Sequence, residues 1–133
     1  MDQPYPIVRH LIACEDLLPD PANRRRVTLV DIMHAIRSLE QPPFPLRRRE
    51  LCIFVQLTEC RGTGAFRIDI VRADSGAVVR RTQPRSHDFG NDPLEVFGLP
   101  FRIQDVLFPE AGLYWVQFWY NDHMIAQEPL LLR

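Results

Sequence analysis

Residues 108–133 have the sequence FPEAGLYWVQFWYNDHMIAQEPLLLR, which contains the clearest strand pattern of the chain. Residues 113–120 are almost entirely large and apolar, and Asn121 and Asp122 then supply a turn before a second run over residues 123–132. Successive side chains of a strand point to opposite faces, so the first of these two strands carries large apolar groups on both faces. The segment therefore predicts a β-hairpin near the end of the chain.

The rest of the chain continues this pattern, because its 12 prolines and 6 glycines separate short apolar runs. No stretch keeps a helical period for long. The other predicted strands cover residues 7–14, 27–37, 50–60, 65–73, 77–82 and 94–103. The alternation is cleanest in two of them, where the core side would hold Leu51, Ile53, Val55 and Leu57, then Phe66, Ile68 and Ile70. The segment EDLLPDPANRRR, residues 15–26, is predicted to be a loop.

About eight strands joined by turns favour an all-β fold, a two-sheet antiparallel sandwich. A small closed β-barrel is the alternative. The length of 133 residues, with 46% hydrophobic residues, fits one β-sandwich domain over residues 1–133.

Four residues before and within the 113–120 strand resemble the tyrosine corner of immunoglobulin-like sandwiches: Glu110, Gly112, Tyr114 and Val116. The resemblance implies that the tyrosine hydroxyl bonds to backbone upstream and that Val116 enters the core. Antibody domains have a cysteine where this chain has Val116, so no disulfide between the sheets is implied.

Three stretches resemble an uncharacterised family of small bacterial all-β proteins. They are ACED at residues 13–16, VTLVDIMHAI at residues 27–36 before a proline-rich crossing, and the closing GLYWVQFWYNDHMIAQEPLLL. That family has no assigned activity, so the resemblance carries no functional residues to this chain.

If Tyr114 forms the corner, then Val116, Phe118 and Tyr120 face the core with it. The outward row would be Leu113, Trp115, Gln117 and Trp119. A lone monomer rarely leaves such an apolar patch in water, so this row is the candidate partner or ligand surface. A second copy of the chain is the simplest partner that would bury this row. The N-terminal segment or the long loop of the same chain is the alternative.

A long polar loop over residues 83–93 holds the most reactive-looking residues, Arg85, His87 and Asp88, with Ser86 between them. It is the candidate functional loop, and we expect it to be the most mobile internal segment. A catalytic triad normally joins residues from separate segments, and neighbours on an extended chain point in opposite directions. A solvated loop is therefore favoured over a catalytic site.

All 16 basic residues are arginine, which excludes lysine-based chemistry such as Schiff bases. Two arginine runs, Arg24 to Arg26 and Arg47 to Arg49, each precede a predicted strand. They would form an anion site if both lay at one end of the sandwich. Otherwise they are solvated strand ends that guard against aggregation, and this second interpretation is favoured.

The three cysteines, Cys14, Cys52 and Cys60, are expected to be reduced and mostly buried. Cys52 and Cys60 lie near opposite ends of one predicted strand, about 26 Å apart at ~3.3 Å per residue, beyond disulfide reach. No cysteine or histidine spacing matches a metal site, and no cofactor is expected.

The formal net charge of -1 argues against a nucleic-acid partner held by phosphate contacts. No segment has the ~20 consecutive apolar residues of a membrane span, and Arg9 and His10 interrupt any signal peptide, so no membrane partner and a cytoplasmic location are expected.

Three functions remain. The first is a non-enzymatic interaction module that forms a homodimer or joins a larger complex. The second is a binding module for carbohydrate or another small ligand that stacks on the tryptophans. The third, less favoured, is an enzyme that uses the 83–93 loop.

Overall fold

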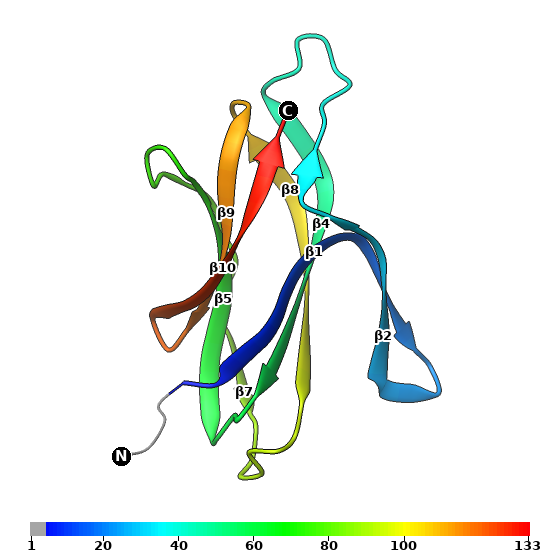
Figure 1. Ribbon diagram of the computed structural model, residues 1–133, viewed down its shortest axis with the longest axis vertical. Coiled ribbons are helices and arrows are strands. Elements are labelled where there is room, and N and C mark those ends of the chain that lie inside the picture. Colours follow the sequence, from blue (N-terminus) through cyan, green and yellow to red (C-terminus); the bar gives the residue numbers. More distant parts are fainter. Residues whose placement is uncertain (1–4) are drawn as a thin grey trace.

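The computed structural model describes residues 5–133, without the side chain of Arg24, and consists of two packed β-sheets (Figure 1). Sheet A has the strand order β2-β1-β4-β8. Sheet B has the order β3-β10-β9-β5-β6, and β7 also pairs with β5. The strands are β1 (Ile7–Asp20), β2 (Asn23–Met33), β3 (Ala35–Ile36), β4 (Leu46–Thr58), β5 (Thr63–Arg72), β6 (Val78–Arg81), β7 (Arg85–Asp88), β8 (Phe97–Phe108), β9 (Gly112–Tyr120) and β10 (His123–Leu132).

The predicted all-β sandwich is confirmed, with ten strands in the described chain rather than about eight. The sheets remain separate and do not close into the barrel that was the alternative. Strand pairs are antiparallel apart from the short pairing of β3 with β10. The described residues include no helix that is long and apolar enough to cross a membrane.

The core lies between the sheets and follows the predicted alternation. The inward residues of β4 have no exposed surface, and those of β5 and β9 are also buried. They include Leu51, Ile53, Val55 and Leu57 from β4, Phe66, Ile68 and Ile70 from β5, and Tyr114, Val116, Phe118 and Tyr120 from β9. Period-two alternation therefore identified the buried side of each of these strands.

The tyrosine corner is present. The hydroxyl of Tyr114 donates a hydrogen bond to the backbone carbonyl of Glu110 at 2.7 Å, and its ring packs edge-on against Phe108 with centroids 5.1 Å apart. These contacts link the start of β9 to the end of β8, so they fix which side chains of β9 face the core.

The predicted loop at residues 15–26 is wrong, because β1 and β2 continue through it as a hairpin. The turn is at residues 21–22, where the Asp20 carboxylate accepts a hydrogen bond from the backbone N–H of Ala22 at 2.8 Å. Pro19 does not break β1, since it lies opposite Val27 immediately before a register shift. The two prolines and the asparagine that predict a loop lie instead at a bulge, in the two-residue turn and at the start of an edge strand.

The predicted strand over residues 27–37 is in fact two strands in different sheets. β2 pairs with β1 in sheet A up to Met33, and β3 then pairs with β10 in sheet B. His34 lies at the crossing, where its carbonyl accepts a hydrogen bond from Leu131 at 3.0 Å.

The long edge strand β8 is covered by arginines from sheet B. Arg85 donates to the carbonyl of Pro100 at 3.0 Å, and Arg80 donates to that of Asp105 at 3.4 Å. An open strand edge can pair with another chain, so these side chains protect that side of sheet A.

Candidate functional site

The outer face of sheet B, here called the aromatic face, contains the predicted outward row of β9. Tyr114 and its alternate neighbours point into the core, so Leu113, Trp115, Gln117 and Trp119 lie on the opposite side. Leu113 is 41% exposed, whereas the two tryptophans are half-buried between neighbouring strands. The sequence therefore predicted both the composition and the direction of this surface.

Strand register extends the apolar part of the aromatic face across four strands. Trp115 lies opposite Val71 of β5 on one side and Pro129 of β10 on the other, and Val71 in turn lies opposite Val78 of β6. Val78 is 47% exposed. A continuous apolar row therefore crosses sheet B from β10 to β6.

The next row of the aromatic face is polar and internally paired. Asp69 is only 1% exposed, and its carboxylate accepts hydrogen bonds from Arg67 at 3.0 Å and from Arg81 at 3.0 Å. The bond to Asp69 raises the pKa of Arg81. Beside them, the amide nitrogen of Gln117 donates to Gln127 at 3.2 Å. The buried charge is thus compensated within the sheet.

The third row joins a cation to an aromatic ring. The Arg67 guanidinium lies 4.5 Å from the ring centroid of Trp119, and the indole N–H donates to the side-chain oxygen of Gln117 at 3.2 Å. Met124, opposite Trp119 on β10, is 40% exposed. Trp119 is therefore fixed in place, with one of its faces occupied by Arg67.

The predicted 83–93 loop is wrong in part, because residues 85–88 form strand β7 along β5. Arg85 and His87 share one face of β7: Arg85 lies over the Phe101 ring at 4.3 Å, and His87 packs against Phe89 at 4.8 Å. Ser86 and Asp88 alternate with them. Strand geometry therefore separates the serine from the histidine and does not assemble a triad. Mobility of this segment stays a prediction.

The two arginine runs lie apart. Arg25 pairs with Glu95 at 3.0 Å, in the loop that precedes β8. Arg48 instead pairs with Glu15 of β1. The side chain of Arg24 lies outside the described residues. Arg25 and Arg26 line a groove beside β8 that Arg47 to Arg49 do not reach, so the described guanidinium groups of the two runs do not gather in one anion site.

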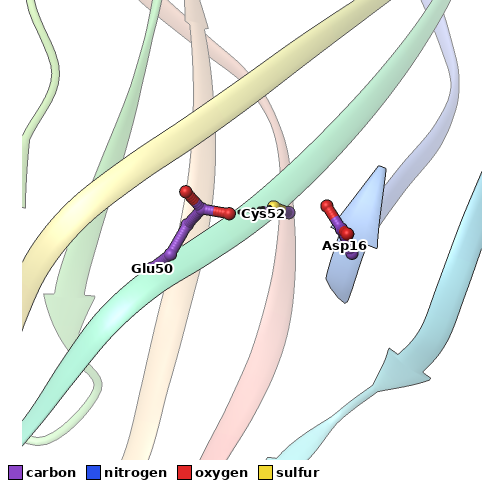
Figure 2. A group of neighbouring side chains, drawn as sticks. All are labelled: Asp16, Glu50 and Cys52. Atoms are coloured by element: carbon purple, nitrogen blue, oxygen red, sulfur yellow. Dashed lines mark hydrogen bonds between the residues drawn. The ribbon is translucent and has the colours of Figure 1, made fainter. Parts of the chain in front are cut away.

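Sequence reasoning missed a polar cluster on the outer face of sheet A. Figure 2 shows Asp16 on β1 beside Glu50 and Cys52 on β4, and their potential metal-ligand atoms lie within 4.8 Å of one another. The Arg102 side chain of β8 extends into this cluster. Its Nη1 donates hydrogen bonds to Oδ1 of Asp16 at 2.8 Å and to Oε1 of Glu50 at 3.0 Å. Its Nη2 also donates to the carbonyl of Leu17.

Arg102 already supplies the positive charge that a metal ion would bring to the cluster. Hydrogen bonds hold the pKa of both carboxyls below their ordinary values, chiefly from Arg102 for Asp16 and from Gln104 for Glu50. Burial acts on the thiol in the opposite direction and raises the pKa of Cys52 to about 11. A protonated thiol is a poor metal ligand, so the arrangement fits an ion-pair network better than a metal centre.

The three cysteines are free, as predicted. Cys14 lies directly opposite Cys52 on the outer side of sheet A, and Cys60 is in the main core just after β4. Burial raises the pKa of Cys60 to about 11 and raises that of Cys14 as well. The juxtaposition of Cys14 and Cys52 depends on strand register, which the sequence alone did not supply.

Comparison with solved structures finds similar folds within much larger proteins. A β-glucosidase from Listeria innocua aligns with 96% of this chain at 10% identity and a TM-score of 0.50, but the alignment covers only 16% of that enzyme. A mutant of the same enzyme in complex with laminaribiose gives a TM-score of 0.51 at 10% identity, over 97% of this chain and 16% of the enzyme. The DNA glycosylase AlkC of Pseudomonas fluorescens, bound to DNA with an abasic site analog, aligns with 75% of this chain and 27% of its own, at 15% identity and a TM-score of 0.46. At 10% identity the likeness to the β-glucosidase concerns the fold alone.

No curated protein matches the sequence. A family model does match, over residues 17–133, and it includes the segment from β2 to β10. The chain belongs to DUF6941, a family of unknown function.

Proposed function

We propose that this domain is a non-enzymatic interaction module that self-associates through the aromatic face. One observation carries the proposal: half-buried Trp115 and Trp119 are bordered by Leu113 and Met124, which remain 41% and 40% exposed. Tryptophan is enriched at the energetically important centres of protein interfaces. A second copy would bury the apolar rows that the described chain leaves in solvent.

The charges of the aromatic face suit pairing with an identical surface. Asp69 is already neutralised by Arg67 and Arg81, so the centre brings no unpaired carboxylate into an interface. Arg67 also lies 3.6 Å from Asp122, whose side chain is exposed at the rim. Both signs are present, and two copies related by a twofold axis would not repel each other as faces of one sign would.

A ring-stacking ligand is the second candidate, and it receives less support. Arg67 occupies one face of the Trp119 indole, and the indole N–H is bonded to Gln117. A sugar ring would compete with that guanidinium. Catalysis by the 83–93 segment is weaker still, because β7 directs Ser86 away from His87. The free thiols support the cytoplasm as the location.

The test is a charge introduced into the centre of the aromatic face. Trp119→Glu should convert the protein to a monomer by light scattering while its circular dichroism spectrum stays that of a β protein. Leu113→Glu provides a second variant, because an exposed leucine can be replaced with less risk to folding. The matched control is Leu39→Glu, at a 90% exposed leucine between β3 and β4.

We expect the control to keep the native molar mass. A native protein that is already monomeric would contradict the proposal. Retention of the native mass by folded Leu113→Glu and Trp119→Glu would also contradict it, because the interface would then lie elsewhere.

A further inference from the structure

The β1–β2 hairpin borders a groove that runs from the outer side of sheet A past the first half of β8 to β7, and its lining contains no residue of the aromatic face. β1 pairs with β4 only as far as Cys14, whereas its pairing with β2 continues to Asp20. Residues 15–30, here called the arm, therefore extend beyond the body of sheet A, as the hairpin at the right of Figure 1 shows. A groove of 780 Å³ separates the arm from the first half of β8.

The floor of the groove is apolar and well packed. Leu17 and Phe54 are buried there with Cys14 and Cys52, and Val27 of the arm packs against this cluster. The floor also needs a glycine at position 98, since a Cβ on Gly98 would lie 2.9 Å from the Phe54 ring. Leu94 is 85% exposed at the rim.

The charged residues that line the groove are predominantly basic. They are Arg25, Arg26, Arg85 and Arg102, with Glu95 as the single carboxylate in the described lining. The whole chain, by contrast, has a formal net charge of -1. Positive charge is therefore concentrated beside the apolar floor.

The arginines of this lining differ in their availability. Arg102 is held by Asp16, Glu50 and the Leu17 carbonyl. Arg25 forms one solvent-exposed pair with Glu95, which contributes little and can exchange partners. Arg26 has no acidic partner among the described side chains. Of these two arginines of the arm, Arg26 can thus bind an incoming anion without first leaving an acidic partner.

We propose that this groove binds a small organic anion with an apolar body. Its carboxylate or equivalent acidic group would bond to Arg26 on the arm, and its apolar part would lie on Phe54, Leu17 and Val27. The volume falls within the roughly 300–1,000 Å³ of small-molecule pockets, which combine an apolar lining with a few polar groups. The site shares no residue with the aromatic face, so anion binding can be tested independently of self-association.

The test compares two probes that share an apolar chain and differ in charge, decanoate and decylammonium. Isothermal titration calorimetry at millimolar probe should show one decanoate per chain, with decylammonium binding at least roughly tenfold more weakly. Arg26→Ala should weaken decanoate binding by roughly tenfold, since it removes a charge-assisted hydrogen bond. The matched control is Arg47→Ala, which removes an arginine of the other run outside the groove lining.

The control variant Arg47→Ala and the interface variant Trp119→Glu should both bind decanoate as the native protein does. Three results would overturn the site: no decanoate binding, equal binding of both probes, or equal weakening by Arg26→Ala and Arg47→Ala. Gly98→Leu gives a test of the apolar part, because its side chain would displace Phe54. Unchanged decanoate binding by that variant would also overturn the assignment.

Discussion

At the scale of single residues, Gly64 makes the tightest steric demand of the fold. It lies in β5 beneath the Tyr120 side chain, and a Cβ at this position would overlap the phenol ring. Tyr120 is itself buried in the core, so the ring has little room to move away.

Gly64→Ala should therefore destabilise the protein by about 1–3 kcal/mol, the usual cost of overpacking a core. The free energy of unfolding in urea measures this change. In a Tyr120→Leu background the added methyl group should cost much less, because the overlapping ring is gone. An equal cost in both backgrounds would show that Tyr120 is not the obstacle.

The buried thiols predict a loss of stability at alkaline pH. Burial raises the pKa of Cys52 and of Cys60 from 9.0 to about 11, so the unfolded chain releases these protons first. Their contribution to stability is complete below about pH 9 and is lost as the pH rises towards 11.

The urea midpoint of the native protein should accordingly fall between pH 7 and pH 10. The fall should be smaller in Cys60→Ala, because this variant lacks the Cys60 thiol and also the negative charge that helps burial to raise the pKa of Tyr120. An identical fall in the two proteins would contradict the assignment to Cys60.

At the scale of elements, the arm depends on Arg102. This side chain links β8 to Asp16 and to the Leu17 carbonyl on β1, beyond the point where β1 leaves β4. A two-stranded hairpin is only marginally stable by itself, so these hydrogen bonds help to keep the arm ordered.

Arg102→Ala should cost about 1–2 kcal/mol, because it removes hydrogen bonds and leaves the carboxylates of Asp16 and Glu50 close together. Amide hydrogen exchange should accelerate in residues 15–30 and stay slow in β5 and β9. Arg47→Ala is the comparison variant. Uniform acceleration over both sheets would mean that Arg102 stabilises the whole fold rather than the arm.

The strands differ in how well the sequence predicted them, for a physical reason. β9 and β10 carry strong apolar patterns, and their predicted bounds lie within a residue of the observed ones. β7 has the sequence RSHD and every residue of it is exposed, so no pattern marks it. Pairing with β5 determines this strand rather than its own composition.

The candidate surfaces follow the same division. Parity along one strand was enough to predict the outward row of β9. The cluster around Arg102 joins residues 52 and 86 positions apart in the chain, namely Glu50 and Asp16 to Arg102. Such contacts depend on strand register and on the course of the arm, which local pattern does not specify.

At the scale of the whole molecule, the two outer faces have different chemistry. The aromatic face is apolar with internally paired charges, which suits a protein interface. The groove of sheet A combines an apolar floor with arginines of the arm, which suits a small anion. The two surfaces share no lining residue, so a dimer formed through the aromatic face would leave both grooves open to solvent.

Sedimentation equilibrium of the native chain measures self-association without any substitution in the protein. Self-association through the aromatic face predicts a molar mass that rises with protein concentration to twice the 15.6 kDa of one chain. A mass that remains at 15.6 kDa over the full range of concentrations would contradict it.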